Sequence, residues 1–165
     1  MGELTLQISL IRVDDRLIHG QVVVGWSKAS RATRIVVADD EVAKNETQKT
    51  IMTYAAPRDV RVSILSIADA AEKLKTNGFP NDIILLLINS PISLLKLIDN
   101  GLTVKKVNIG NVRIAPGRTR LTKEVAATQE EIEAWKKIDG LGITLEAVWL
   151  PGGAITDFNK IIRSL

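Results

Sequence analysis

The feature that most constrains the fold of this chain is a regular alternation of short apolar runs with segments of helical periodicity. Apolar runs of strand length recur at residues 4–11, 34–38, 60–65, 83–88, 104–109 and 143–150. Between them, apolar residues recur at helical spacing in residues 20–30, 45–55, 67–77, 91–98 and 128–140. Residues 83–88 form the most continuous apolar run, which predicts the central strand of a sheet covered on both faces.

This alternation predicts an α/β fold: an open, mainly parallel, doubly wound sheet with helices on both faces. We expect a single domain over residues 1–165, because 165 residues fall within the usual size of one domain. Two segments are less regular. Residues 112–127 contain only a short extended stretch around 119–121, and residues 157–165 are read as either a short terminal helix or a frayed tail.

The composition argues against several classes of function. Aromatic residues make up 4% of the chain and the net charge is only +3, so nucleic-acid binding is not expected. That mild positive balance suits a small anionic group or an acidic partner. The chain has no cysteine, which excludes disulfides and thiolate metal sites. With no apolar run of about 20 residues and no signal-peptide layout, we expect a cytoplasmic protein.

Residues 12–22 contain the best candidate for a reactive site. They hold His19, the only histidine of the chain, together with two arginines and two aspartates. A histidine is largely uncharged, and therefore nucleophilic, near neutral pH. A helix that begins near Gly20 would direct unpaired N–H groups and its positive dipole end at the same place. The hypothesis is a phosphoryl group carried on His19; the structural alternative is a histidine that caps the helix or bonds within the core.

The charged neighbours of His19 are candidates for binding the phosphoryl group or for orienting the imidazole. Arg16 is the first choice for holding the phosphoryl oxygens, and its alternative is a surface arginine paired with Asp14 or Asp15. Arg12, at the strand end, either binds the phosphoryl group or anchors the loop to the sheet. One of the two carboxylates, Asp14 or Asp15, is expected to orient the imidazole by accepting its second N–H.

Other positions are assigned supporting roles. Gly20 lets the backbone approach the phosphoryl group closely, or is a simple turn glycine. Gln21, just inside the helix, is counted with the phosphoryl-binding residues; its alternatives are a bond to the loop backbone or no particular role. The pair Asp39 and Asp40 is expected to be structural rather than part of a partner-binding surface. A basic set follows the loop at residues 110–111 and either faces a partner or is a solvated surface: Arg113, Arg118, Arg120 and Lys123.

The segment RVDDRLIHGQV, residues 12–22, resembles the active-site segment of the enzyme IIB component of the bacterial sugar phosphotransferase system, in its mannose/fructose/sorbose family. The resemblance implies the same fold and a phosphocarrier role. His19 would accept a phosphoryl group from a phosphorylated IIA protein or domain, and pass it to a sugar held by the membrane components IIC and IID. The absence of cysteine excludes the IIB families that carry phosphate on that residue.

Further expectations follow from the resemblance. The site needs no metal and no cofactor, because phosphohistidine is already activated. The protein would lie at the inner face of the membrane through IIC and IID. Mannose, fructose, sorbose and amino sugars all remain open as the sugar, and a homo-oligomer is compatible with the sequence.

The sequence also allows three alternative interpretations. A receiver-like domain would use Asp39 and Asp40 as metal-binding acids, but it needs an acceptor aspartate where the central strand ends in Asn89. A nucleotide-binding module is disfavoured because neither G-x-G-x-x-G nor G-x-x-x-x-G-K-[ST] occurs. The alternative function is a regulatory protein that keeps the fold without sugar transport.

Overall fold

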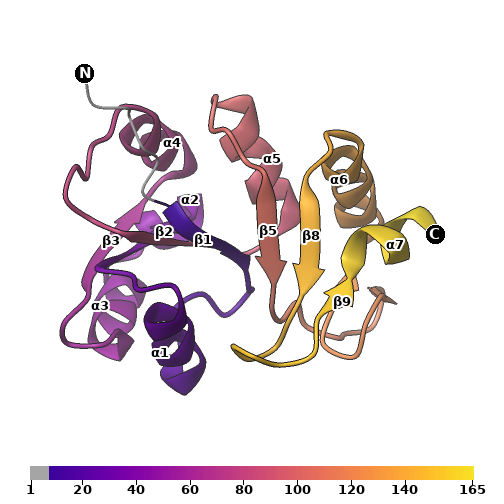
Figure 1. Cartoon of the computed structure of the whole chain (residues 1–165), viewed down its shortest axis with the longest axis horizontal. Helices are drawn as coiled ribbons and strands as arrows, with labels where there is room; N and C mark the ends of the chain where they lie inside the picture. The colour runs from indigo at the N-terminus through magenta and orange to yellow at the C-terminus, as the bar shows by residue number, and fades with distance from the viewer. Residues whose placement is uncertain (1–7) are drawn as a thin grey trace.

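A computed structural model describes residues 8–165 as alternating strands and helices (Figure 1). The strands are β1 Ile8–Val13, β2 Arg34–Ala38, β3 Arg61–Leu65, β4 Ile84–Ile88, β5 Lys106–Ile109, β6 Thr119–Arg120, β7 Ala126–Ala127, β8 Thr144–Ala147 and β9 Thr156–Asp157. The helices are α1 Gly20–Ala29, α2 Asp40–Ala43, α3 Glu46–Ala55, α4 Ile67–Lys75, α5 Pro91–Asp99, α6 Gln129–Gly140 and α7 Phe158–Arg163. Residues 4–7 of the first predicted strand lie outside the described residues.

Seven strands form one sheet in the order β3-β2-β4-β1-β5-β8-β9. All neighbouring pairs are parallel except β8 and β9, which are antiparallel. The strands β6 and β7 form a separate antiparallel hairpin within the irregular segment 112–127. The prediction of an open, mainly parallel α/β sheet is therefore confirmed.

The strand β4 is an interior strand between β2 and β1, and all five of its residues are buried. Its side chains alternate between the two faces of the sheet, which explains why the sequence is apolar without interruption. Leu86 and Ile88 contribute to one apolar cluster, and Leu85 and Leu87 to the other.

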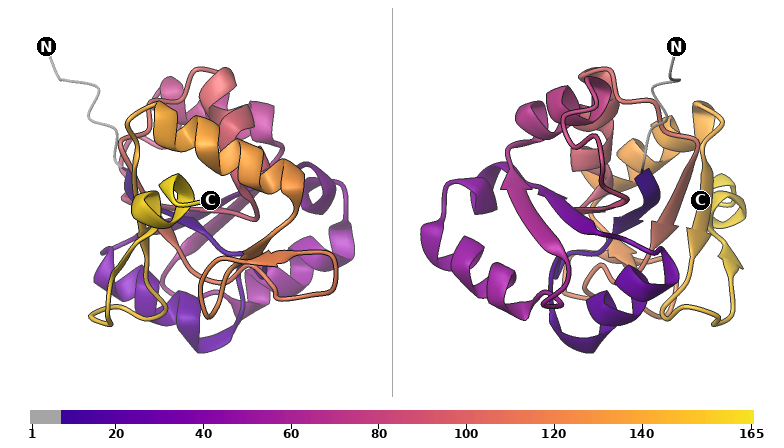
Figure 2. Two further views of the ribbon diagram at one scale, coloured as in Figure 1. Left: turned by 90° about the vertical axis from the view of Figure 1, so that its right-hand side faces the viewer. Right: turned by 60° about the vertical axis from the view of Figure 1, so that its left-hand side comes forward.

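The helices cover both faces of the sheet (Figure 2). Val23 and Trp26 of α1 pack into the same cluster as Met52 of α3. On the opposite face, α4, α5, α6 and α7 pack into the larger cluster, where Trp135 and Phe158 meet edge to face with their ring centroids 5.0 Å apart. Right-handed crossovers require this division, because the chain moves along the sheet in one direction from β1 to β3 and then reverses.

The structure differs from the sequence predictions at the end of the chain. The last parallel strand ends at Ala147 rather than at residue 150. Val148 N still donates to Ile109 O at 2.9 Å, but the chain then turns toward Pro151, which has no N–H to continue the ladder. The short strand β9 was not predicted, and residues 158–163 form the terminal helix α7. Among the described helices, none is long and apolar enough to cross a bilayer.

Candidate functional site

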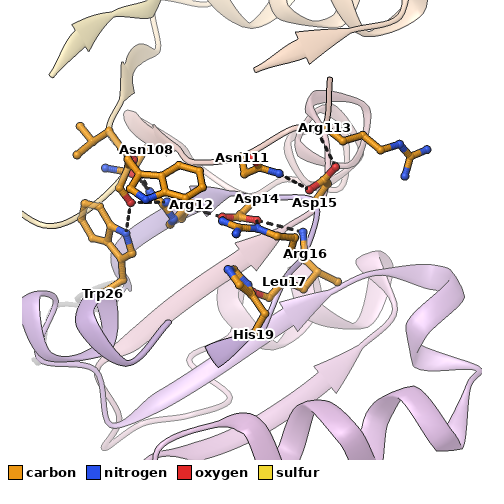
Figure 3. A network of polar contacts seen from close by, with 12 residues as sticks. Arg12, Asp14, Asp15, Arg16, Leu17, His19, Trp26, Asn108, Asn111 and Arg113 are labelled. Carbon is orange, nitrogen blue, oxygen red and sulfur yellow. Dashed lines mark hydrogen bonds and ion pairs between the residues drawn. The ribbon is translucent and has the colours of Figure 1, made fainter. Parts of the chain in front are cut away.

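The loop between β1 and α1 carries the candidate site at the carboxyl end of the sheet (Figure 3). The chain leaves β1 toward the face covered by α1, and it leaves the neighbouring strand β5 toward the face covered by α6. Such a point, where adjacent strands send their connections to opposite faces, is where open α/β sheets bind ligands. The predicted location of the site agrees with this topology.

Arg12 anchors the loop from within the protein, since its side chain is only 2% exposed. Its guanidinium donates to the Asn108 side chain, to Val148 O at 2.9 Å and to Trp149 O at 3.1 Å. It also lies over the Trp26 ring, 4.5 Å from the centroid. Burial lowers the pKa of Arg12 to about 10, although the nearby charge of Asp14 opposes the shift. Arg12 was predicted either to bind the phosphoryl group or to anchor the loop to the sheet, and in this structure it anchors the loop.

Asp14 orients Arg16 rather than His19. Its buried carboxylate accepts from Arg16 Nε at 3.1 Å and from Arg16 Nη2 at 3.0 Å, and also from the Arg16 backbone N–H at 3.0 Å. Arg12 Nη2 lies 3.7 Å from the same carboxylate. The expectation that an aspartate orients the imidazole is therefore wrong for this structure, because two arginines occupy the Asp14 oxygens.

The ion pair with Asp14 fixes the position of Arg16 and leaves part of its hydrogen-bonding capacity free. A guanidinium has five N–H donors, and the fork formed by Nε and Nη2 engages Asp14 while Nη1 remains. The guanidinium also lies over the indole of Trp149, 4.9 Å from the ring centroid. With a side chain 33% exposed, Arg16 combines a fixed orientation with access to a ligand.

His19 is held by a backbone carbonyl. Its Nδ1 lies 2.9 Å from Leu17 O, and Leu17 itself has a φ of 57°. The other nitrogen, Nε2, is buried and has no hydrogen-bond partner among the described residues. An unpaired buried nitrogen on a candidate nucleophile is the kind of exception that marks a functional group.

Asp15 ties the loop to the segment that follows β5. Its carboxylate accepts from Asn111 Nδ2 at 3.1 Å and from the Arg113 backbone N–H at 2.9 Å, while Asp15 N donates to Asn111 O at 2.8 Å. This contact brings Arg113 beside the site, as Figure 3 shows. Like Asp14, Asp15 orders the backbone around His19 and makes no bond to the imidazole among the described contacts.

The helix α1 begins directly at the candidate nucleophile. His19 is the N-cap residue, and no side chain caps the first turn. The other six helices in residues 8–165 each have a side-chain cap: Asp39, Asn45, Ser66, Ser90, Thr128 and Asp157. The N–H groups that open α1 thus keep their capacity to bind an anion next to His19.

Two other predicted positions lie in the first turn of α1. Gly20 has a φ of 48°, so glycine is favoured there by the backbone, and a Cβ at this position would meet nothing within 4 Å. Open space in front of this backbone leaves room for a ligand. Gln21 is exposed, and its side chain makes no hydrogen bond to another part of the described chain.

Residues farther from His19 have structural roles. Asp39 caps α2, and Asp40 accepts from the Ile67 backbone N–H at 2.9 Å, as expected for a structural pair. In the basic set, Arg118 pairs with Glu131 at 2.6 Å and is largely buried, so it is not free to face a partner. Arg120 donates to two carbonyls of its own hairpin, whereas Arg113 and Lys123 are exposed.

Four further residues shape the site, and the sequence alone assigned none of them an individual role: Leu17, Asn108, Gly110 and Trp149. A Cβ on Gly110 would lie 2.1 Å from Arg12 Nη2, so only glycine fits beside the buried guanidinium. Asn108 carried a usable signal, because it is a polar residue inside an apolar strand pattern. Trp149 carried none, since its contacts with Arg12 and Arg16 join distant parts of the sequence.

Together, the fold and the site define a class of protein: an α/β protein that presents a histidine at the uncapped start of a helix, beside an oriented arginine. Comparison with known proteins identifies the family. The model of the PTS system sorbose subfamily IIB component matches residues 8–165, so the chain belongs to that family. It is a IIB component of a sugar phosphotransferase system, has a transferase role and works with other components of such a system.

Individual relatives agree with this assignment. The fructose-specific EIIB component of Bacillus subtilis is 34% identical over 97% of this chain and 98% of its own length. The crystal structure of the IIBSor domain of the sorbose permease from Klebsiella pneumoniae superposes with a TM-score of 0.89 and 31% identity, covering 96% of this chain and 97% of that one. The mannose-specific EIIAB component of Escherichia coli is 34% identical over 84% of this chain, which matches 43% of its length.

Proposed function

We propose that His19 accepts a phosphoryl group from a phosphorylated IIA protein or domain and transfers it to a sugar held by the membrane components IIC and IID. The observation that carries the proposal is that His19 is the N-cap of α1, the one helix in residues 8–165 without a side-chain cap. A mannose-specific relative named EIIAB combines a IIA and a IIB part, which supports IIA as the donor.

The chemistry is two successive substitutions at phosphorus. In the first, a ring nitrogen of His19 bonds to phosphorus while the phosphorus–nitrogen bond of the donor histidine breaks. In the second, a sugar hydroxyl oxygen bonds to phosphorus, the bond to His19 breaks, and the hydroxyl proton is lost. Because phosphohistidine is an activated donor, the site has to position the group and neutralise its charge.

Charge neutralisation is assigned to Arg16 and to the start of α1. A phosphoryl group brings about two negative charges to the site. Arg16 meets them with the N–H donors that Asp14 does not use, and the first-turn N–H groups of α1 add hydrogen bonds and the favourable end of the helix dipole. Gly20 permits the close backbone approach, and Arg12 acts indirectly by fixing Asp14. Gln21, exposed in the first turn of α1, is a further candidate for contact with the phosphoryl group.

The position of the protein in the cell follows from the same proposal. The chain acts in the cytoplasm, at the inner face of the membrane, where IIC and IID hold the sugar. It acts as one domain, and we assign the choice of sugar to the membrane components.

The test is phosphoryl transfer from labelled phosphoenolpyruvate through enzyme I, HPr and a cognate IIA. We expect label that is acid-labile and base-stable on the wild-type chain, and none on His19→Ala, whose fold should be unchanged. Because His19 is the only histidine, label on that variant would overturn the proposal. Absence of label on the wild type with several IIA proteins would favour the regulatory alternative.

A second variant separates chemistry from binding. Arg16→Ala should slow transfer by about 100-fold or more, since it removes a fixed charge that meets the developing phosphoryl charge. Its affinity for IIA, measured by titration, should change far less. Arg58→Ala is the matched control, because Arg58 is exposed and lies just before the edge strand β3, at the amino end of the sheet, whereas the site lies at the carboxyl end. Equal loss in both variants would contradict the role of Arg16.

A further inference from the structure

Leu17 has an unusual backbone conformation beside His19. Its φ of 57° lies in the left-handed region, which leucine adopts rarely and at a cost. Its side chain is buried in the cluster beneath α1, with 3% of its surface exposed. Its backbone N–H donates to Asp14 O at 3.0 Å, and its carbonyl oxygen faces His19. A strained non-glycine residue that persists next to a reactive group is a common feature of functional sites.

The carbonyl of Leu17 fixes the proton on the imidazole. A carbonyl oxygen can only accept, so the 2.9 Å contact requires His19 Nδ1 to carry a hydrogen. A neutral imidazole has a single N–H, and the hydrogen bond made by one nitrogen decides which one carries it. The lone pair of the neutral ring is then on Nε2.

The nitrogen with the lone pair is not open to a phosphoryl donor. Nε2 is buried without a partner among residues 8–165. His19 lines a cavity of about 10 Å³ with two charged residues, Arg12 and Asp14, and with apolar residues of the loop, of α1 and of β4: Leu17, Val22, Val23, Trp26 and Leu87. Such a cavity has room for about one water molecule, which is far less than a phosphoryl group and its donor histidine need. In this conformation Nδ1 is occupied by its proton and by Leu17, and Nε2 is enclosed.

We infer that Leu17 is a positioning residue that holds His19 in an unreactive resting orientation, with the proton on Nδ1 and Nε2 covered. The contact between Leu17 O and His19 Nδ1 has to break, and the ring has to turn, before either nitrogen can attack. The relevance to transfer rests on the proposed function, whereas the tautomer of the resting ring does not. The buried leucine side chain anchors the left-handed backbone that aims the carbonyl.

The wild-type chain provides the first measurement. Its single histidine gives unambiguous imidazole ¹⁵N signals, and these distinguish a protonated Nδ1 from a protonated Nε2 in the neutral ring. We expect Nδ1 to carry the proton. A neutral ring with its proton on Nε2 would overturn the inference, whether or not His19 accepts phosphate.

Two variants at position 17 test the role of the backbone. Leu17→Ile keeps the apolar volume but adds a β-branch that disfavours a positive φ, whereas Leu17→Met keeps both the volume and the unbranched Cβ. Carbethoxylation of His19 by diethyl pyrocarbonate, followed by its absorbance near 240 nm, reports how freely the unprotonated ring reacts. We expect Leu17→Ile to react about tenfold faster than wild type, in line with the cost of the left-handed conformation, and to lose the Nδ1–H signature. Leu17→Met should match wild type in both.

Arg31→Ile controls for general destabilisation. Arg31 is exposed at the end of α1 and has a φ of 56°, so isoleucine meets the same backbone penalty away from the site. This variant should keep the wild-type tautomer and rate of carbethoxylation. If Leu17→Ile and Arg31→Ile react alike, or if Leu17→Ile keeps the Nδ1–H signature, the inference is wrong. Absence of phosphoryl label with the Nδ1 tautomer intact would overturn the proposed function and leave the position of the ring as inferred.

Discussion

Gly110 is a position where one added carbon atom should strongly destabilise the protein. A Cβ there would lie 2.1 Å from Arg12 Nη2 and 2.7 Å from Asp14 Oδ2, so both groups would have to move by about 1 Å to reach ordinary contact. Neither has free space, because Asp14 is 1% exposed and Arg12 Nη2 donates to Trp149 O. Overpacking costs about 1–3 kcal/mol. A lost hydrogen bond to a charged group costs about 1.5–3 kcal/mol.

We therefore expect Gly110→Ala to lower the free energy of unfolding by about 3–5 kcal/mol, measured by urea denaturation with the slope of the transition unchanged. Transfer to His19 should also slow, because the displaced groups orient Arg16. Gly140→Ala is the matched control, since a Cβ there meets nothing within 4 Å and Gly140 lies in α6. That control should gain about 0.5–1 kcal/mol. A Gly110→Ala protein within about 1 kcal/mol of wild type would refute the packing argument.

Three further changes test other parts of the structure. Burial alone would raise the pKa of Asp82, but the hydrogen bonds and charges of Arg34 and its neighbours outweigh it, so the pKa lies below 3.8. The ionised carboxylate therefore contributes stability above pH 3.8, and this contribution is lost as the pH falls through the lower pKa that Asp82 has in the folded protein. Asp82→Asn has no such group to titrate, so below pH 3.8 it should lose less stability than wild type in acid titrations followed by circular dichroism. Asp15→Asn places an amide against the Arg113 N–H or the Asn111 amide and should cost about 1–2 kcal/mol, with faster hydrogen exchange at Arg113. Trp135→Ala should cost about 3–5 kcal/mol in urea yet leave the His19 ¹⁵N signals unchanged.

The architecture was predictable because the information that specifies it is local. The parallel strands appear as short apolar runs and the longer helices as periodic segments, several of them preceded by a capping residue such as Thr128 before α6. The handedness of crossovers then leaves few ways to arrange these elements in one sheet. The boundaries of β8 were less predictable, because its apolar pattern continues to residue 150 while the backbone leaves the sheet after Ala147.

The loop that carries the candidate site was predictable, and the contacts within it were not. Residues 12–22 share one short loop, so their proximity follows from the sequence. Which carboxylate meets which cation depends on burial and on distant segments: Arg12 is held by Val148 and Trp149, more than 130 residues away in sequence. The left-handed backbone of Leu17 has no signal in its residue type, since leucine normally avoids it.

These contacts close into a ring that fixes one cation in front of His19. Arg12 donates to the Trp149 carbonyl and lies beside Asp14. Asp14 accepts two hydrogen bonds from the Arg16 guanidinium, which in turn lies over the Trp149 indole. A buried guanidinium is costly, as the lowered pKa of Arg12 indicates, and a hydrophobic residue in its place would often be as stable. A hydrophobic residue would leave Asp14 with Arg16 as its one cationic partner, would remove the guanidinium donor of Val148 O, and would leave Trp149 O with Trp26 Nε1 alone. The buried charge is therefore better explained by the orientation it gives to Arg16 than by the stability of the fold.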